Sequence, residues 1–171
     1  ERFFDYLIQW KNRIALFHYA GHANNKGLSL QDIHADFEPL AEELLLRNRN
    51  SLCVVVLNGC STQAHVKRLL DKGVKAVIAT ASRVDDTVAA QFAIRFYKNL
   101  AKDKETLWEA YESAANYTKT GRIHEKRFQR LGEVLRTADF EAKEPKEFPW
   151  GLYIGNDKQV LRYTLCGGMP S

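Results

Sequence analysis

The sequence is poor in cysteine, with three in 171 residues, and no two of them form a Cys-x-x-Cys pair. An odd number of cysteines, set in or beside apolar segments, argues against the paired disulfides of a small secreted scaffold. A thiol oxidoreductase is disfavoured as well, because a resolving cysteine is missing. No apolar run approaches the roughly 20 residues that a membrane-spanning helix needs, and no signal-peptide pattern is found. We therefore expect free thiols, no membrane association and a cytoplasmic location.

Charge of one sign is not in large excess either. Lys and Arg number 25 and Asp and Glu number 21, for a net charge of +4, and no basic block is interleaved with aromatic residues. This balance argues against nucleic acid as a direct partner. The length corresponds to about one domain, and we find no internal repeat. We expect residues 1–171 to form a single domain, and the amphipathic helical pattern at its first residues suggests a fragment of a longer chain.

The most informative segment is the apolar run over residues 53–57, which a glycine ends immediately before Cys60. A continuous apolar run of this length is typical of a strand buried on both faces in a parallel sheet. A second run over residues 14–19 has the same form, with a glycine after it and then His22. The sequence therefore predicts two interior strands, each followed closely by a residue that can do chemistry.

The carboxyl ends of neighbouring parallel strands meet at one edge of a sheet, where ligand and catalytic groups collect. If the two strands are neighbours, His22 and Cys60 emerge there side by side. An imidazole beside a thiol favours the thiolate and can return a proton to a leaving group. The pair is thus the minimum equipment for nucleophilic cysteine catalysis. The alternative for Cys60 alone is a buried thiol at the end of a strand.

Strands and helices alternate along the first 100 residues, which indicates a parallel sheet with right-handed crossovers. A capping box of Thr106 with Glu109 predicts the start of a further helix, and Asp85 or Asp86 is the expected cap of the helix before it. The pattern predicts helices over 3–10, from about Pro39 to Asn50, 63–72, 87–100 and 106–117, a strand over 74–80, a partial helix with loop over 120–147, and a hairpin of strands 150–154 and 159–165.

The segments HYAGH and NGCST, with GVKAVIATASRVDD and FPWGLYIGND after them, resemble the CHAT domain. This caspase-like domain is often attached to tetratricopeptide repeats and is related to caspases, gingipains and separase. The resemblance covers roughly residues 14–115 and 148–157. It implies a caspase-like three-layer α/β sandwich, with a mostly parallel central sheet flanked by helices. It also implies hydrolysis of a peptide bond through a thioester.

The family's catalytic dyad carries over to His22 and Cys60, and its oxyanion hole to the backbone N–H groups of Cys60 and Ala23. The family usually has glycine where this chain has Ala23, so a β-carbon would be strained if that turn needs a positive φ. Two function classes stay open. One is a cysteine endopeptidase acting on a protein substrate and regulated by an appended domain or partner, such as tetratricopeptide repeats. The other is a pseudoprotease that serves as an interaction module.

Asp85 and Asp86 follow the strand at 74–80, where the separase branch of the resemblance places acidic residues that bind a basic side chain. We hypothesise a preference for Arg or Lys just before the cleaved bond. The alternative is that one aspartate caps the helix, and one residue could do each.

Other histidines and cysteines have simpler interpretations. His18 and His22 are spaced as metal ligands can be, but no third and fourth ligand completes a site, so neither metal nor cofactor is expected. We interpret His18 as a core residue and His65 as a solvent-facing or capping residue in the first turn of a helix. Cys53 and Cys166 are expected to be buried strand thiols.

Overall fold

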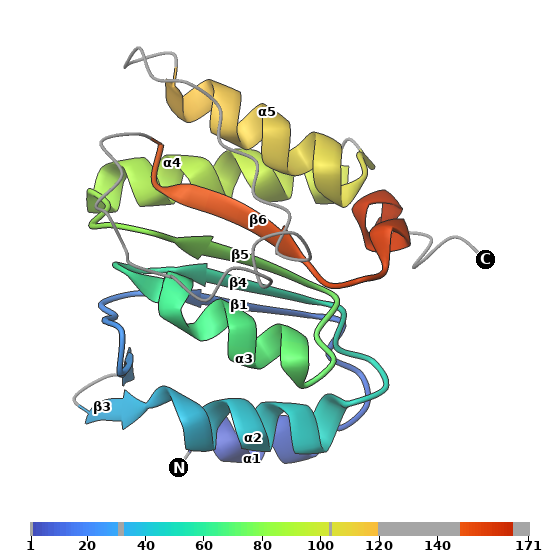
Figure 1. The fold of residues 1–171 in the computed structure, drawn as a ribbon. Helices are drawn as coiled ribbons and strands as arrows, with labels where there is room; N and C mark the ends of the chain where they lie inside the picture. The colour runs from blue at the N-terminus through green and yellow to red at the C-terminus, as the bar shows by residue number, and fades with distance from the viewer. Residues whose placement is uncertain (1, 31–32, 103, 120–147, 166–171) are drawn as a thin grey trace.

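The chain forms a four-stranded sheet covered by helices on both faces (Figure 1). The computed structural model describes residues 2–30, 33–102, 104–119 and 148–165. The strand order is β1-β4-β5-β6, the first three strands are parallel and β6 is antiparallel to β5. These strands are β1 (Leu16–Ala20), β4 (Val54–Asn58), β5 (Ala76–Thr80) and β6 (Trp150–Ile154). The mostly parallel three-layer sandwich expected from the sequence is therefore confirmed.

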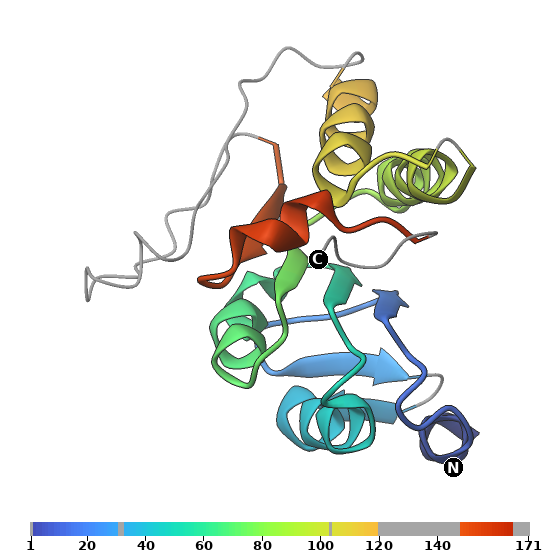
Figure 2. The ribbon, with the colours of Figure 1, turned by 90° about the vertical axis from the view of Figure 1, so that its right-hand side faces the viewer.

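The helices divide between the two faces of this sheet (Figure 2). One layer contains α1 (Arg2–Gln9), α2 (Phe37–Asn48) and α3 (Val66–Asp71), and the other contains α4 (Asp86–Tyr97) and α5 (Leu107–Lys119). The shorter elements are an antiparallel hairpin of β2 (Gly27–Leu30) and β3 (Ile33–Asp36), the 3-10 turns η1 (Thr62–His65) and η3 (Lys158–Arg162), and a π-helical turn η2 (Lys98–Lys102).

The sheet separates two apolar cores because successive side chains of a strand point to opposite faces. Val55 and Leu57 of β4 pack with the α1, α2 and α3 layer, whereas Val54 and Val56 pack with α4 and α5. All five residues of each of β4, β5 and β6 are buried. Burial on both faces explains why these strands have unbroken apolar sequences, and it makes the sheet a rigid base for the loops at its edge.

Several local signals act as the sequence predicts. The Asp85 carboxylate accepts hydrogen bonds from the Thr87 and Val88 N–H groups, at 2.9 and 3.2 Å, and so caps α4. Thr106 and Glu109 form the reciprocal capping box at the start of α5. These caps confirm the expected helix starts.

Two expected elements differ in the structure. The segment 159–165 was expected to be a strand, but residues 158–162 form the 3-10 turn η3 instead. The Asp157 carboxylate accepts a hydrogen bond from the Gln159 N–H at 3.0 Å and caps that turn, while Val160 is fully buried in the core beside α4 and α5. The helix expected over 63–72 begins as the 3-10 turn η1 before it becomes α3. The prediction for 120–147 lies outside the described residues.

Candidate active site

Strands β1 and β4 end in register, and this brings the two predicted catalytic residues to one edge. Ala20 of β1 lies opposite Asn58 of β4, and the Gly21 N–H donates to the Asn58 carbonyl oxygen at 3.4 Å. His22 and Cys60 each follow two residues after this last pair. The parallel neighbours that the sequence analysis required are therefore present.

The loops that carry these residues touch at their glycines. A β-carbon at Gly59 would lie 2.6 Å from the Gly21 carbonyl oxygen and 2.9 Å from the Ala23 β-carbon. Both distances are shorter than real β-carbon contacts, so only glycine allows this approach. Gly21 itself has φ +157°, a backbone conformation that residues other than glycine rarely adopt.

A buried tyrosine holds the backbone of the His22 loop. The Tyr19 hydroxyl lies 2.5 Å from the His22 carbonyl oxygen and 3.0 Å from the Ser29 carbonyl oxygen, and it accepts a bond from the Ser29 N–H at 3.1 Å. The same Ser29 N–H also donates to the His22 carbonyl at 2.8 Å. Burial raises the pKa of Tyr19, so its hydroxyl keeps the proton that it donates. The loop is thereby tied to β2.

A pair of buried threonines supports the turn that carries Cys60. The Thr62 hydroxyl donates to the Leu57 carbonyl at 2.9 Å and accepts from the Thr80 N–H at 3.0 Å. The Thr80 hydroxyl donates to the Gly59 carbonyl. Satisfied buried polar networks of this kind fix one geometry, because any other leaves a buried group without a partner.

Asn58, the last residue of β4, joins the Cys60 turn to the opposite layer. Its side-chain amide donates to the Ala89 carbonyl in α4 at 2.9 Å. The side-chain Oδ1 of Asn58 accepts from the Trp150 indole N–H of β6 at 3.0 Å. Asn58 is buried, and both ends of its amide are paired. The amide therefore fixes α4 relative to Cys60.

His22 and Cys60 line one cavity of about 290 Å³ at this edge of the sheet. Cys60 is partly exposed, and its Sγ lies 4.0 Å from the Val84 carbonyl oxygen. One helical face of α4 forms the opposite wall, with mainly small side chains: Asp86, Ala89, Ala90 and Ala93. A thiol, an imidazole and one carboxylate thus share a cavity that is otherwise lined largely by small residues.

The two aspartates differ in position. Asp86 lines the cavity, whereas Asp85 is outside the lining and caps α4. Ala23 is also outside the lining, but it packs against Gly59 and pairs with Leu28 across the turn into β2. Ala23 does not have a positive φ, so the strain considered for this position is not present.

The expectation for His65 was wrong. Its side chain is 4% exposed, stacks on Phe37 with ring centroids 3.9 Å apart, and its Nε2 lies 3.0 Å from the Asn24 carbonyl oxygen. Burial is the main reason that the pKa of His65 is lowered. The residue therefore links the helical segment after Cys60 to the loop after His22. The place of His65 in the first turn of a predicted helix did not indicate its contact with Asn24, because that contact depends on the fold of β2 and β3.

The remaining predicted residues lie away from the cavity. His18 is partly buried, with its ring 5.2 Å from that of Tyr97, and burial lowers its pKa. Cys53 is a free, partly buried thiol just before β4, and Cys166 lies outside the described residues. No three His, Cys, Asp or Glu side chains of the described ranges are grouped as metal ligands.

Comparison with known protein families matches residues 4–129 to the CHAT domain. This match covers well over half of the chain. The chain belongs to the CHAT domain family. Among curated proteins, the comparison finds no match. In the described part of this CHAT domain, no helix has the length and apolar character to cross a membrane.

We expect Gly59→Ala to lower the free energy of unfolding by about 1–3 kcal/mol, because the added methyl collides with the Gly21 carbonyl and the Ala23 side chain. Gly155→Ala is the matched control, since a β-carbon there meets no atom within 4 Å. Its effect should stay within about 0.5 kcal/mol. Urea denaturation measures both. Equal stability of the two variants would contradict the close approach of the loops.

We expect the protein to lose stability as pH falls through about 6.5, with His65 as one cause. The unfolded chain takes up a proton on this residue there, whereas burial holds the folded imidazole neutral to lower pH, so acid favours unfolding. His65→Gln keeps a hydrogen-bond donor but does not titrate. Melting temperatures at about pH 7.5 and 5.5 should therefore differ less for the variant than for the wild type. The same difference in both proteins would contradict this role.

Proposed function

We propose that this CHAT domain is a cysteine endopeptidase that uses a dyad of His22 and Cys60. The observation that carries the proposal is that both side chains line one cavity, on loops that meet at Gly21 and Gly59. The membership of a caspase-like family supports the same reaction class. Apart from this pair, Asp86 is the one titratable residue among the described lining residues.

In the proposed reaction, His22 accepts the thiol proton and Cys60 Sγ attacks the carbonyl carbon of the scissile peptide bond. The resulting oxyanion collapses, the C–N bond breaks, and His22 gives its proton to the leaving amine. The acyl group is then held as a thioester on Cys60. A water molecule, deprotonated by His22, attacks the thioester and releases the acid product and the free thiol.

The oxyanion would be held by the backbone N–H groups of Cys60 and Ala23. Neither group donates a hydrogen bond to another described residue. Ala23 and Leu28 form an antiparallel pair that is not itself hydrogen-bonded. The bonds on either side of it run from the Asn24 N–H to Gly27 and from the Ser29 N–H to His22, so the Ala23 N–H stays free. One of these free donors belongs to Cys60 itself and the other to a residue packed against Gly59, which supports this role. An unstrained Ala23 also removes the feature that favoured a pseudoprotease.

The residue before the cleaved bond would enter the cavity along α4, and we propose a preference for Arg or Lys. The small side chains of Ala89, Ala90 and Ala93 leave room for a long side chain. The Asp86 carboxylate in the wall supplies an opposite charge. The natural substrate would be a protein. In keeping with the family's architecture, we propose control by an appended domain or a partner protein such as a tetratricopeptide-repeat domain.

We expect Cys60→Ala to abolish cleavage and His22→Ala to lower kcat by about 10²–10⁴-fold. Cleavage is followed through the new protein termini that mass spectrometry identifies in cell lysate after treatment with wild type or variant. Cys53→Ala is the control thiol and should leave cleavage intact. An unchanged set of termini with Cys60→Ala, together with no labelling of Cys60 by an iodoacetamide probe, would leave only the interaction-module function.

We expect Asp86→Asn to raise KM for peptides with Arg or Lys before the cleaved bond by about tenfold, because one tenfold step corresponds to a charge interaction of about 1.4 kcal/mol. Asp85→Asn removes the same charge one residue away but keeps the capping oxygen, so it should leave KM unchanged. Fluorogenic peptides compare the two. A preference for acidic or apolar residues in the wild type would refute the proposed specificity.

A further inference from the structure

A second hollow, of about 560 Å³, is formed by segments that follow the two candidate catalytic residues in the chain. One of its walls is the turn that follows His22, and the other is the exposed face of η1 and α3, which follow Cys60. Four cationic side chains line it with one carboxylate, and the basic residues are Lys26, Lys67, Arg68 and Lys72. None of them takes part in the proposed peptide cleavage.

Two of these cations pair with carboxylates that are open to water. Lys67 pairs with Asp71 at 2.6 Å, and their side chains are 64% and 53% exposed. Arg68 pairs with Glu38 of α2 at 3.3 Å, with exposures of 43% and 57%. Ion pairs this open to water contribute little, because water screens them. A multiply charged anion can therefore replace the carboxylates.

Of the other two cations, Lys72 pairs with Glu42 of α2, and Lys26 is better placed for a ligand. Lys26 forms no ion pair with any other residue in the described ranges. Its turn is preformed, since the Asn24 side-chain oxygen accepts bonds from the Lys26 and Gly27 N–H groups at 2.8 and 2.9 Å. Arg68 faces the same hollow, and a guanidinium offers a planar pair of donors to phosphate oxygens.

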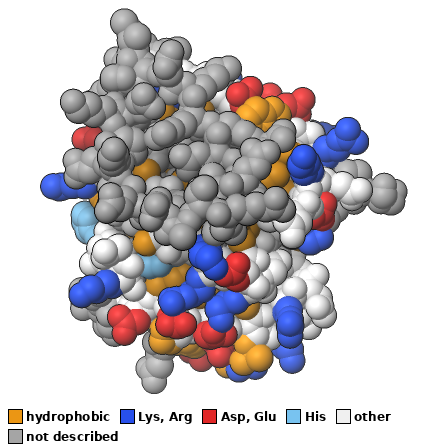
Figure 3. Space-filling view, in the orientation of Figure 1, with side chains coloured by type: hydrophobic (Ala, Val, Ile, Leu, Met, Phe, Trp, Pro, Cys, Tyr) orange, Lys and Arg blue, Asp and Glu red, His pale blue; other side chains and the backbone are white. Residues whose placement is uncertain are grey.

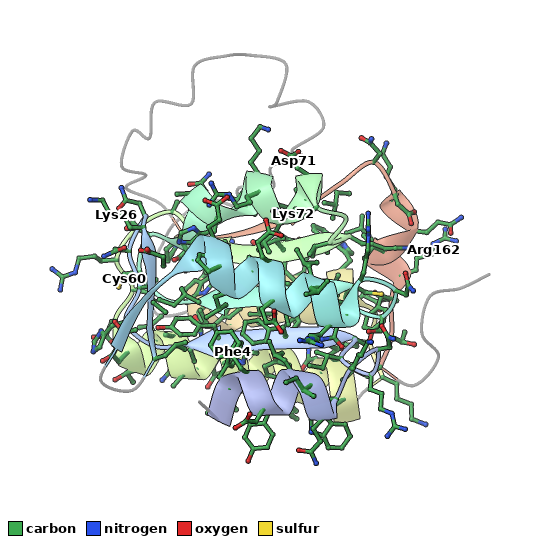
Figure 4. All side chains as sticks on the ribbon, turned by 90° about the horizontal axis from the view of Figure 1, so that it is seen from below. Phe4, Lys26, Cys60, Asp71, Lys72 and Arg162 are labelled. Carbon is green, nitrogen blue, oxygen red and sulfur yellow. The ribbon has the colours of Figure 1, made fainter. Side chains whose placement is uncertain are left out.

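The Lys26 side of this hollow lies toward the candidate active site, whereas Asp71 and Lys72, on its other side, lie nearer the middle of the molecule (Figure 4). Lys26 and Cys60 lie at the same end of the sheet, whereas Arg162 lies at the other end (Figure 4). The buried His65 at the hollow already bonds the Asn24 carbonyl. Basic and acidic side chains are intermixed over the surface of α2 and α3 (Figure 3). The face in this view carries no patch of one charge over α2 and α3.

We propose that the hollow binds a small polyanion of the phosphate class, such as a pyrophosphate group, and that binding raises the activity of the adjacent site. The ligand would bridge Lys26 on the His22 side to Arg68 and Lys67 on the Cys60 side. A bridge of this kind adds a second link between the two segments, which the His65 bond to the Asn24 carbonyl already joins. The effect on activity rests on the proposed peptidase function, whereas binding itself does not.

Isothermal titration calorimetry of pyrophosphate into the full chain carrying Cys60→Ala tests the binding. We expect one saturable site, and we expect Lys26→Gln and Arg68→Gln each to raise Kd by about tenfold or more. Arg162→Gln removes the same charge from the far end of the sheet and should leave Kd unchanged. The absence of a saturable heat, or equal weakening by Arg162→Gln, would overturn the proposal.

A variant that removes a negative charge serves as a control, because damage to the fold would weaken binding and could not strengthen it. Glu38→Gln frees Arg68 from its exposed partner and should lower Kd by several-fold, because a competing carboxylate is removed. A higher Kd in this variant would contradict the assignment of Arg68 as a ligand of the anion.

The effect on activity is measured with the wild-type chain and a fluorogenic peptide that it cleaves. Saturating pyrophosphate should raise kcat/KM several-fold in the wild type and in Arg162→Gln, but not in Lys26→Gln. Binding at the hollow with no change in the rate of an active enzyme would overturn the regulatory half. Binding to a chain that cleaves no peptide would mean instead that the peptidase proposal has failed.

Discussion

The backbone of Gly59 passes so close to the Gly21 carbonyl oxygen that no larger residue fits between the two loops. This approach depends on the parallel register of β1 and β4, which end at the pair Ala20 and Asn58. Because the two strands stop together, the residues that follow β1 lie against those that follow β4. The cavity, the thiol and the imidazole are arranged around that contact. A catalytic use of the edge requires the sheet to be rigid, and burial of β4 and β5 on both faces provides this.

The polar groups beneath the cavity are as constrained as the apolar core around them. Asn58, Thr62 and Thr80 are buried, and each has hydrogen-bond partners on separate elements. Their bonds reach α4, β6 and the turn that carries Cys60. Displacing that turn would leave several of these groups unpaired at once, which costs more than losing a single contact. The position of Cys60 is therefore set by the interior and not by the loop alone.

The sequence was sufficient for the features that depend on local pattern. Unbroken apolar runs predicted β4 and β5, capping residues predicted the starts of α4 and α5, and the strand ends predicted where His22 and Cys60 lie. Features that depend on distant contacts were missed. The apolar segment after Asp157 reads as a strand by alternation, but burial of Val160 and a local cap make it a 3-10 turn. His65 and the Tyr19 hydroxyl acquire their roles only when the β2–β3 hairpin folds against them.

The equal spacing from each strand end to its reactive residue limits how this chain can change in length. The connection between β1 and β4 contains a hairpin and α2, and insertions there leave both strand ends where they are. One residue inserted between Ala20 and His22, or between Asn58 and Cys60, would place one reactive residue farther from its strand end than the other and lengthen a turn that is closely packed at Gly21 and Gly59. Insertions and deletions in related sequences should therefore fall within the crossover connections and not at residues 21–22 or 59–60.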